Sequence, residues 1–553
     1  MNSLSSAGEA QLSTTDRKRA TTAGLTLAGG GWMSNLIVYL IQEFNVKSIN
    51  AAQISNIVNA CTSLIPVLGA IIADSFFGCF SVVWISSSIS LLGSILLALT
   101  AILHSLRPQP CENGSSTLCK NPSKLQFAVL YGGIALASIG VGGTRFIVAT
   151  MGANQFKKPK AQSTFFNWYF FTIYTAAVLS TTAIVFIEDN VSWACGFGIT
   201  VAANALGLAI FLLGNRFYHH VEPEGSPFTG LARVVVATIR KRKVGQLSSG
   251  SENYYHGHDG VPLKIMAATP TKSFRFLNRA ALITEGDINP DGSIAKPWKL
   301  CTIQHVEDLK TLIRILPIWS SSIFLATPIG IQATLSILQA LTMDRHIGPH
   351  FKFPAGSILV FVLVSTSISL TMLDRLVWPT WQNLIGRSPT PLQRIGVGHV
   401  LNVVGMVVSA LVESKRLSIA QSHHFQGQPS SNIVPISVLW LVPQLVLVGI
   451  GEAFHFPGQV TLYYQEFPTS LKNLSTAIIS LIIGIAFYLS TALIDLTRRV
   501  TDWLPDNIND GRLDNVYWLL VGIGVVNFGY YLICAMLYKY QSVENRVDVS
   551  PQL

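Results

Sequence analysis

An arginine inside an otherwise apolar segment is the residue with the most evident chemistry in this sequence. Arg145 lies between one and two turns from the end of the run 125–150, which is long enough to cross a bilayer. A charge within such a run costs at least a few kcal/mol unless it is solvated or paired, so Arg145 predicts a functional site. The alternative, that Arg145 reaches a membrane interface, is less favoured because the polar flank 154–160 lies still further along the chain.

A second charged residue in an apolar run is Glu452, and His455 follows it by three residues, which places both on one face of a helix. A histidine beside a carboxylate can titrate in the physiological range and make a site sensitive to acid. A histidine that only makes a hydrogen bond is the simpler alternative. Glycines at 29–31 and 140–143 do not lie between a strand and a soluble helix, as in a phosphate loop, and therefore predict close helix packing.

The composition indicates that these residues belong to a membrane protein. Of the 553 residues 50% are hydrophobic and only 12% are charged, whereas soluble globular proteins carry about 25% charged residues. The net charge of +10 comes from Lys and Arg clusters between apolar runs, so it reports topology rather than nucleic-acid binding. Since neither metal-spaced Cys and His residues nor a nucleophile triad is evident, we expect no metal, no cofactor and no enzyme activity.

Apolar runs long enough to cross a membrane occur as two groups of six, separated by a long polar segment. The sequence therefore predicts an all-α polytopic membrane protein with about twelve transmembrane helices in two six-helix bundles. The expected parts are an N-terminal stretch 1–19, a first bundle 20–214, a central segment 215–308, a second bundle 309–540 and a tail 541–553.

The basic clusters predict the orientation. The run 240–243 in the central segment and the lysines at 157, 158 and 160 place that segment and both termini in the cytosol. No cleavable signal precedes the first run, because residues 1–16 are polar and lead into the basic residues 17–19. Two basic pairs, at 415–416 and 498–499, fall on the outer side and are exceptions to the rule.

This orientation gives two loops an expected role. Cys111 and Cys119 share an external loop with the sequon at Asn113, which predicts a disulfide and a glycan, with free thiols and an unused sequon as the alternative. In the central segment, residues 231–240 predict an amphipathic helix. Its apolar face would lie on the inner leaflet or cover protein only, and it consists of Leu231, Val234, Val235 and Ile239.

Six spans, a cytosolic bridge and six further spans resemble the plan of the major facilitator superfamily, in which two bundles rock about a site at the membrane midplane. After the second span, Gly69, Asp74 and Gly78 resemble the cytosolic gate motif of that superfamily. Cys79 stands where a basic residue ordinarily follows, which puts the usual charge contact of the gate in doubt.

Several segments are similar to a narrower group, the plant nitrate and peptide transporter family. They follow the family's order and span nearly the whole chain: GVGGTRFIVATMGANQF (140–156), FFNWYFF (165–171), EDNVSWACGFG (188–198), KSFRFLNRAAL (272–282), PWKLCTIQHVEDLK (297–310), LPIW (316–319) and VGIGEAFHFPGQ (448–459). Proton-coupled members carry two glutamates and an arginine in the first span. Thr22, Leu25 and Thr26 stand at those positions here, so the resemblance argues against tight proton coupling.

The resemblance further implies that Arg145 and Glu452 occupy facing helices and pair across the two bundles. An anion arriving at Arg145 would then compete with Glu452, so that binding and opening are linked, unless the pair is only a structural bridge. Because the missing first-span charges make the cavity more positive, a small anion is favoured over a cationic peptide. The neutral side chains that could bind it are those of Tyr39, Asn59, Tyr169 and Gln332.

Without the acidic motif, the chain most resembles the nitrate excretion subgroup of that family. The resemblance implies passive, potential-driven nitrate efflux across a plant plasma membrane, with the bilayer and a small inorganic anion as partners and no nucleic acid. Chloride efflux, proton-coupled symport of nitrate or a metabolite, and a transport-silent sensor remain alternatives.

Overall fold

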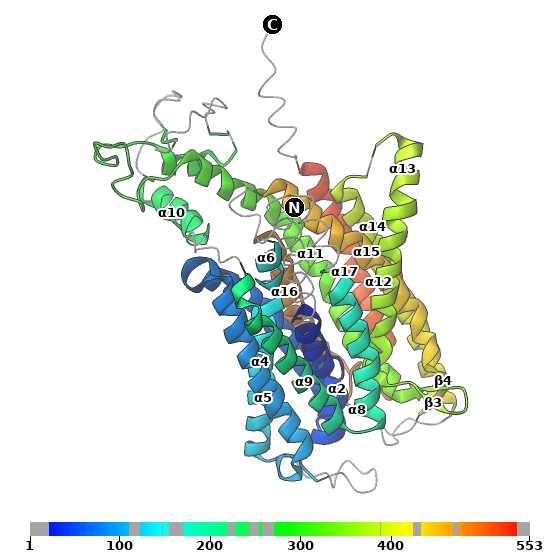
Figure 1. The fold of residues 1–553 in the computed structure, drawn as a ribbon. Coiled ribbons are helices and arrows are strands. Elements are labelled where there is room, and N and C mark those ends of the chain that lie inside the picture. Colours follow the sequence, from blue (N-terminus) through cyan, green and yellow to red (C-terminus); the bar gives the residue numbers. More distant parts are fainter. Residues whose placement is uncertain are drawn as a thin grey trace, which may run out of the picture.

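A computed structural model describes residues 21–109, 122–145, 147–153, 169, 171–218, 227–242, 254–256, 270–271, 273–387, 389–423, 433–467 and 474–538. Long helices packed side by side make up most of these residues, as predicted (Figure 1). The expected cysteine pair and sequon at 111–119 and the basic residues at 157–160 lie outside the described residues.

Ten helices of the described part are long and apolar enough to cross a membrane, or eleven if the bent pair Thr21–Ser34 and Leu36–Phe44 is one span. One of the ten, Ser48–Ile102, has 55 residues, far more than the roughly 20 that one crossing needs. It contains α3 (Ser48–Ile72) and α4 (Gly78–Ile102), joined by a π-helical turn, and Gly78 there adopts φ +74°, a conformation that favours glycine. Counted as two crossings, this segment raises the number of spans to the predicted twelve.

The first half of the chain forms one bundle. Its helices are Thr21–Ser34, α2 (Leu36–Phe44), α3, η1 (Ala73–Phe77), α4, η2 (His104–Leu106), α5 (Lys124–Arg145), α6 (Ile147–Ala153), Phe171–Asn190 with η3 (Ser180–Ile184) and α8 (Val185–Asn190), α9 (Trp193–Leu213) and η4 (Asn215–Phe217). Within it, α4 and α5 approach closely because small residues face each other: a β-carbon at Gly93 would lie 2.3 Å from the backbone nitrogen of Ala137.

The second half forms the other bundle. Its helices are α11 (Ile303–Thr342), η7 (Ala355–Leu359), α12 (Val360–Met372), η8 (Leu373–Val377), α13 (Trp378–Ile385), α14 (Pro391–Ser422), η9 (Val438–Leu441), α15 (Val442–Glu466), α16 (Leu474–Val500) and α17 (Leu513–Leu537). Short strands lie at one end: β1 (Met343–Asp344) pairs in parallel with β4 (Val434–Ser437), and β2 (His346–Ile347) pairs antiparallel with β3 (Phe351–Lys352). The two bundles meet most extensively where α3 packs along α16.

Between the bundles, the central segment forms α10 (Pro227–Arg240) and η6 (Arg275–Ala281) at the end opposite the strands (Figure 1). We call these two ends the linker end and the strand end. α10 buries Val234 and Ala237 in a cluster with residues of η6, but Val235 and Ile239 remain 43% and 58% exposed. The expected apolar face is therefore divided, because the helix packs on protein along one side only.

A buried carboxylate holds the central segment together. Asp287 and Lys241 are almost fully buried and form an ion pair of 3.0 Å, and Lys299 binds the other carboxylate oxygen at 2.9 Å. Burial raises the pKa of Asp287, but hydrogen bonds from Thr284, Lys299 and Lys241 together outweigh burial and bring the pKa down to about 2. Because this folded value lies below the unfolded one, the carboxylate stabilises the fold above about pH 4, and the contribution disappears as the pH falls through about 2.

We predict that Asp287→Asn lowers the thermal unfolding temperature, because it leaves the Lys241 ammonium group buried without its counter-ion. Breaking such a buried pair typically costs about 3–5 kcal/mol. Differential scanning fluorimetry of the purified protein measures the effect. Glu285→Gln, at an exposed neighbouring carboxylate, is the matched control, and an equal change in both variants would contradict the assignment.

A second prediction concerns the contact of α4 with α5. Gly93→Ala should destabilise the protein by about 1–3 kcal/mol, because the added methyl group overlaps the backbone of α5. Gly132→Ala, in α5 itself, meets nothing within 4 Å and should leave the unfolding temperature unchanged. The same scanning measurement compares the two variants, and tolerance of Gly93→Ala would show that the helices are less closely packed than described.

Candidate functional site

A cavity of about 460 Å³ lies between the two bundles. The first bundle contributes wall residues from the helix Thr21–Ser34, α3, α5 and the helix Phe171–Asn190, and the second contributes residues from α11, α12, α15 and α16. Most of the wall is apolar, and the polar side chains on it are few. Such a concave, largely apolar space with a few polar groups is typical of a site for a small ligand.

Arg145 lies on this wall because the glycines before it let α5 pack closely on α3 and α4. A β-carbon at Gly140 would lie 2.3 Å from the Ser90 β-carbon, and one at Gly142 would lie 2.7 Å from the Thr62 carbonyl oxygen. The predicted role of these glycines in helix packing is confirmed. Larger residues there would push α5 away and move Arg145, the last residue of α5, relative to the cavity.

Among the described residues that line the cavity, Arg145 is the only Lys, Arg or His. Its side chain is exposed to the cavity space, although it lies deep between the bundles. Tyr169, also on the wall, donates a hydrogen bond of 2.6 Å from its hydroxyl to the backbone oxygen of Arg145. This bond supports the chain at the point where α5 ends, and so helps to fix the position of the guanidinium group.

Glu452 of α15 is the only acidic residue on the described wall, and it belongs to the opposite bundle from Arg145. Thr366 of α12 donates a hydrogen bond of 3.4 Å to its carboxylate. Tyr174 lies close enough to interact electrostatically with both charges. The ion pairs recorded between described residues do not include Arg145 with Glu452, so their pairing stays a prediction that this conformation does not display.

Three uncharged positions of the first span face the same cavity. The wall includes Thr22, Leu25 and Thr26. These are the positions at which proton-coupled members of the nitrate and peptide transporter family carry ionisable groups. The described wall therefore has one positive and one negative residue, rather than the larger set that those groups would give.

Two of the expected neutral donors also reach the cavity. Asn59 of α3 donates from Nδ2 to the Ser55 backbone oxygen at 2.9 Å, and the second N–H of this nitrogen is the donor it can offer a ligand. Gln332 of α11 donates to the Ser409 hydroxyl at 2.7 Å. Thr144 and Thr181 were not among the expected donors but line the same wall. Only their spacing along two apolar helices could have indicated them.

The structure corrects two of the expected binding residues, which lie away from the cavity. Tyr39 is fully buried, bonds the Thr100 hydroxyl at 2.8 Å and packs against Phe44 and Trp193, so its phenol belongs to the core near the strand end. His455 points into the second bundle, toward Gly398, because helical rotation carries it away from the face of Glu452 that meets the cavity. Within the described residues, neither of its ring nitrogens has a hydrogen-bond partner.

The expected gate motif lies at the linker end, at the turn between α3 and α4. Gly69 is packed against Ile147, with 3.0 Å from an added β-carbon to the Ile147 side chain, and Gly78 supplies the turn with positive φ. Asp74 falls within the π-helical turn Ala73–Phe77, and its side chain is outside the described set. The role of these residues as a gate stays a prediction.

Comparison with known proteins decides the family. The family model described as the POT family matches residues 80–509, most of the chain. The chain belongs to the POT family. This POT family member is 55% identical over 526 residues to "Protein NRT1/ PTR FAMILY 2.7" of Arabidopsis thaliana, covering 95% of this chain and 92% of the relative. It is also 55% identical over 525 residues to "Protein NRT1/ PTR FAMILY 2.6" of the same plant, with the same coverage.

Solved structures agree on the fold of this POT family member. The crystal structure of the POT family transporter PepTSo superimposes with a TM-score of 0.69 at 16% identity, covering 95% of this chain and 97% of that one. An auto-inhibited POT family peptide transporter gives a TM-score of 0.66 at 16% identity, with the same coverage. The predicted fold and the resemblance to the nitrate and peptide transporters are confirmed, and the chain is a multi-pass membrane transporter of the major facilitator type.

The contrast between the two tyrosines gives a testable prediction. Tyr169→Phe removes the hydrogen bond to the Arg145 backbone and should weaken transport several-fold, since such a bond contributes about 1 kcal/mol. Tyr39→Phe removes an equivalent hydroxyl far from the cavity and should lower thermal stability while leaving the apparent substrate affinity unchanged. Flux in reconstituted vesicles, measured over a range of substrate concentrations, separates the two, and equal transport defects would contradict the placement of the site.

Proposed function

We propose that this transporter is a uniporter that releases nitrate from the cell by alternating access, driven by the membrane potential. The single observation that supports this most is the charge of the cavity wall, where Arg145 is the one described cation and the first-span positions Thr22, Leu25 and Thr26 carry no charge. Such a wall offers a monovalent anion a cation at Arg145 and lacks, at these three positions, the groups that a proton relay would use.

The driving force fits a carrier without a coupled proton. An inside-negative potential of about 100 mV gives roughly 2.3 kcal/mol for each monovalent anion that leaves the cell. Export of nitrate therefore needs no second ion. The proposal places this protein in the plasma membrane with the linker end and both termini in the cytosol, as the basic clusters predict.

Arg145 and Glu452 would link binding to the conformational change. They lie on opposite bundles and face one cavity, so any approach of the bundles around an empty site would bring the two charges toward each other. A pair formed there would stabilise the closed empty carrier, and an anion at Arg145 would compete with the carboxylate. In the conformation described here Glu452 accepts a hydrogen bond from Thr366, and in the closed empty carrier it would pair with Arg145.

Two alternatives are each favoured by one observation. Chloride has the same charge as nitrate, and the neutral wall groups Asn59 and Gln332 do not by their chemistry exclude it. Proton-coupled symport is favoured by Glu452 itself, because this carboxylate faces the cavity and could carry a proton.

The decisive experiment measures anion efflux from proteoliposomes loaded with nitrate or chloride, with a potassium-set potential and no pH gradient. Nitrate should leave faster than chloride. Arg145→Ala should reduce this flux at least roughly tenfold, since hydrogen bonds to a charged group contribute about 1.5–3 kcal/mol, and Arg145→Lys should retain part of it.

Controls separate the alternatives. In a uniporter, Glu452→Gln should keep potential-driven flux but change the apparent affinity for the anion, because the carboxylate no longer competes at Arg145. If Glu452 carries a coupled proton, the same variant should abolish flux. Unchanged flux in Arg145→Ala at equal incorporation would contradict the proposed site. Flux that requires an imposed proton gradient would contradict the uniport mechanism, and the absence of any flux would favour a sensor.

A further inference from the structure

At the strand end, polar contacts join the two bundles. Lys47, which precedes α3, forms an ion pair of 2.6 Å with Asp506 in the loop between α16 and α17. Arg498 near the end of α16 donates to the Asn50 side chain at 2.9 Å and also pairs with Asp506. Asp506 thus binds one cation from each bundle, and it is the residue through which the loop 501–512 reaches across.

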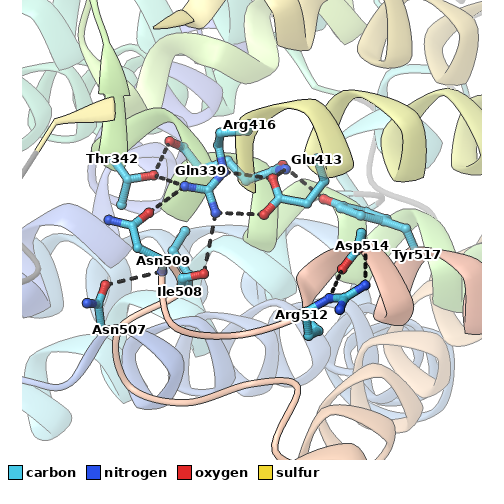
Figure 2. Close-up of polar contacts among 10 residues, drawn as sticks. All are labelled: Gln339, Thr342, Glu413, Arg416, Asn507, Ile508, Asn509, Arg512, Asp514 and Tyr517. Carbon is cyan, nitrogen blue, oxygen red and sulfur yellow. Dashed lines mark hydrogen bonds and ion pairs between the residues drawn. The ribbon is translucent and has the colours of Figure 1, made fainter. Parts of the chain in front are cut away.

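A second anchor holds this loop from the inside of the second bundle (Figure 2). Arg416 of α14 donates from Nη1 to the Asn509 side-chain oxygen at 2.5 Å and from Nη2 to the Ile508 backbone oxygen at 3.4 Å. Both acceptors lie within three residues of Asp506. A shift of the arginine would therefore move the segment that carries the cross-bundle ion pair of Asp506 with Lys47.

Arg416 is itself held by several buried hydrogen bonds. Its Nε and Nη2 bind the two Glu413 carboxylate oxygens at 2.8 and 2.6 Å, and its Nη1 also donates to the Thr342 hydroxyl at 3.1 Å. Gln339 of α11 donates to Glu413 at 2.6 Å and accepts from the Tyr517 hydroxyl of α17 at 3.0 Å. All five N–H groups of the guanidinium have acceptors, and neither charged side chain is exposed.

Stability alone does not explain such a pair. A buried ion pair is often no more stabilising than apolar residues of the same volume, because both ions lose their hydration. An apolar substitute would lack directed hydrogen-bond donors, whereas a guanidinium places several donors in a fixed plane. Here that plane aims Nη1 and Nη2 out of α14 at the loop, which is the part of the network that an apolar core could not replace.

We propose that Glu413 and Arg416 are positioning residues of a latch at the strand end. The pair fixes Asn509 and Ile508, and this places Asp506 between Lys47 and Arg498. The Lys47–Asp506 ion pair and the Arg498–Asn50 hydrogen bond, which both cross between the bundles, then hold the strand end closed. Opening at this end separates Lys47 from Asp506 while the loop stays with the second bundle. The latch therefore sets how often the cavity opens at the strand end, and this holds for any substrate that the cavity accepts.

The test measures access to the cavity from the strand end. A cysteine at Ser34, which lines the cavity on the first span, is labelled with a membrane-impermeant thiol reagent in sealed vesicles of known orientation. The same protein without this substitution gives the background from native cysteines. Asp506→Asn should speed labelling from the strand-end side roughly two- to five-fold, the range expected for loss of a partly exposed ion pair. Asp502→Asn removes an equal charge from an exposed position of the same loop and should have no effect.

The positioning role is tested through Asn509 and Arg416. Asn509→Ala leaves the Glu413–Arg416 pair intact but releases the loop, so it should speed labelling as Asp506→Asn does. Arg416→Lys retains the charge without the planar donors and should act in the same direction. Combining Asn509→Ala with Asp506→Asn should add little to either alone, because both act through one contact.

A purely structural role gives a different result. It would lower the unfolding temperature and leave the ratio of labelling from the two sides unchanged. Unchanged labelling in Asp506→Asn, or an equal rise in Asp502→Asn, would overturn the latch. Additive effects of Asn509→Ala and Asp506→Asn would overturn the positioning role.

Discussion

The constraint on which this structure depends is the low polarity of the space that its helices cross. A charge there must have a partner or water, so the few charges within the spans mark the places where the protein does something other than pack. Arg145 faces the cavity from the first bundle and Glu452 faces it from the second. Their positions on opposite bundles are informative, since a ligand that enters the cavity meets one charge from each bundle. In the proposed mechanism, this arrangement would link binding to bundle movement.

The same constraint explains how much could be predicted. Local patterns in the sequence predict the apolar spans, their division into two bundles and the packing role of the glycines before Arg145. Local patterns do not predict which polar side chains reach the cavity, because one hydrogen bond or one step of helical rotation decides it. Tyr39 was expected at the site and bonds Thr100 instead, whereas Tyr169, expected for the same reason, reaches the wall. Both tyrosines are polar residues in apolar runs, and only the tertiary packing distinguishes them.

Arg416 shows a second limit of structure prediction from the sequence. In the sequence it appeared as an exception to the distribution of basic residues between loops, paired by position with Lys415. In the structure the two neighbours differ completely: Lys415 lies over the ring of Trp440 at 3.7 Å, whereas Arg416 is fully buried with Glu413. The spacing of Glu413 and Arg416 by three residues on an apolar helix was the available signal. Its acceptors at 508 and 509 are more than ninety positions away, which no local pattern indicates.

The buried Glu413–Arg416 pair at the strand end and the cavity charges Arg145 and Glu452 depend on their surroundings in opposite ways, and this difference suits a carrier. At the strand end, the acceptors of Arg416 are all protein atoms, so its energy does not depend on what the cavity contains. In the cavity, Arg145 is exposed to the space between the bundles, so its energy changes with every ligand that enters. A ligand can shift a conformational equilibrium only through contacts that differ between the states. In the proposed mechanism the cavity charges would supply such differential contacts, while the buried network would give the loop that carries Asp506 a constant geometry as the bundles separate and meet again.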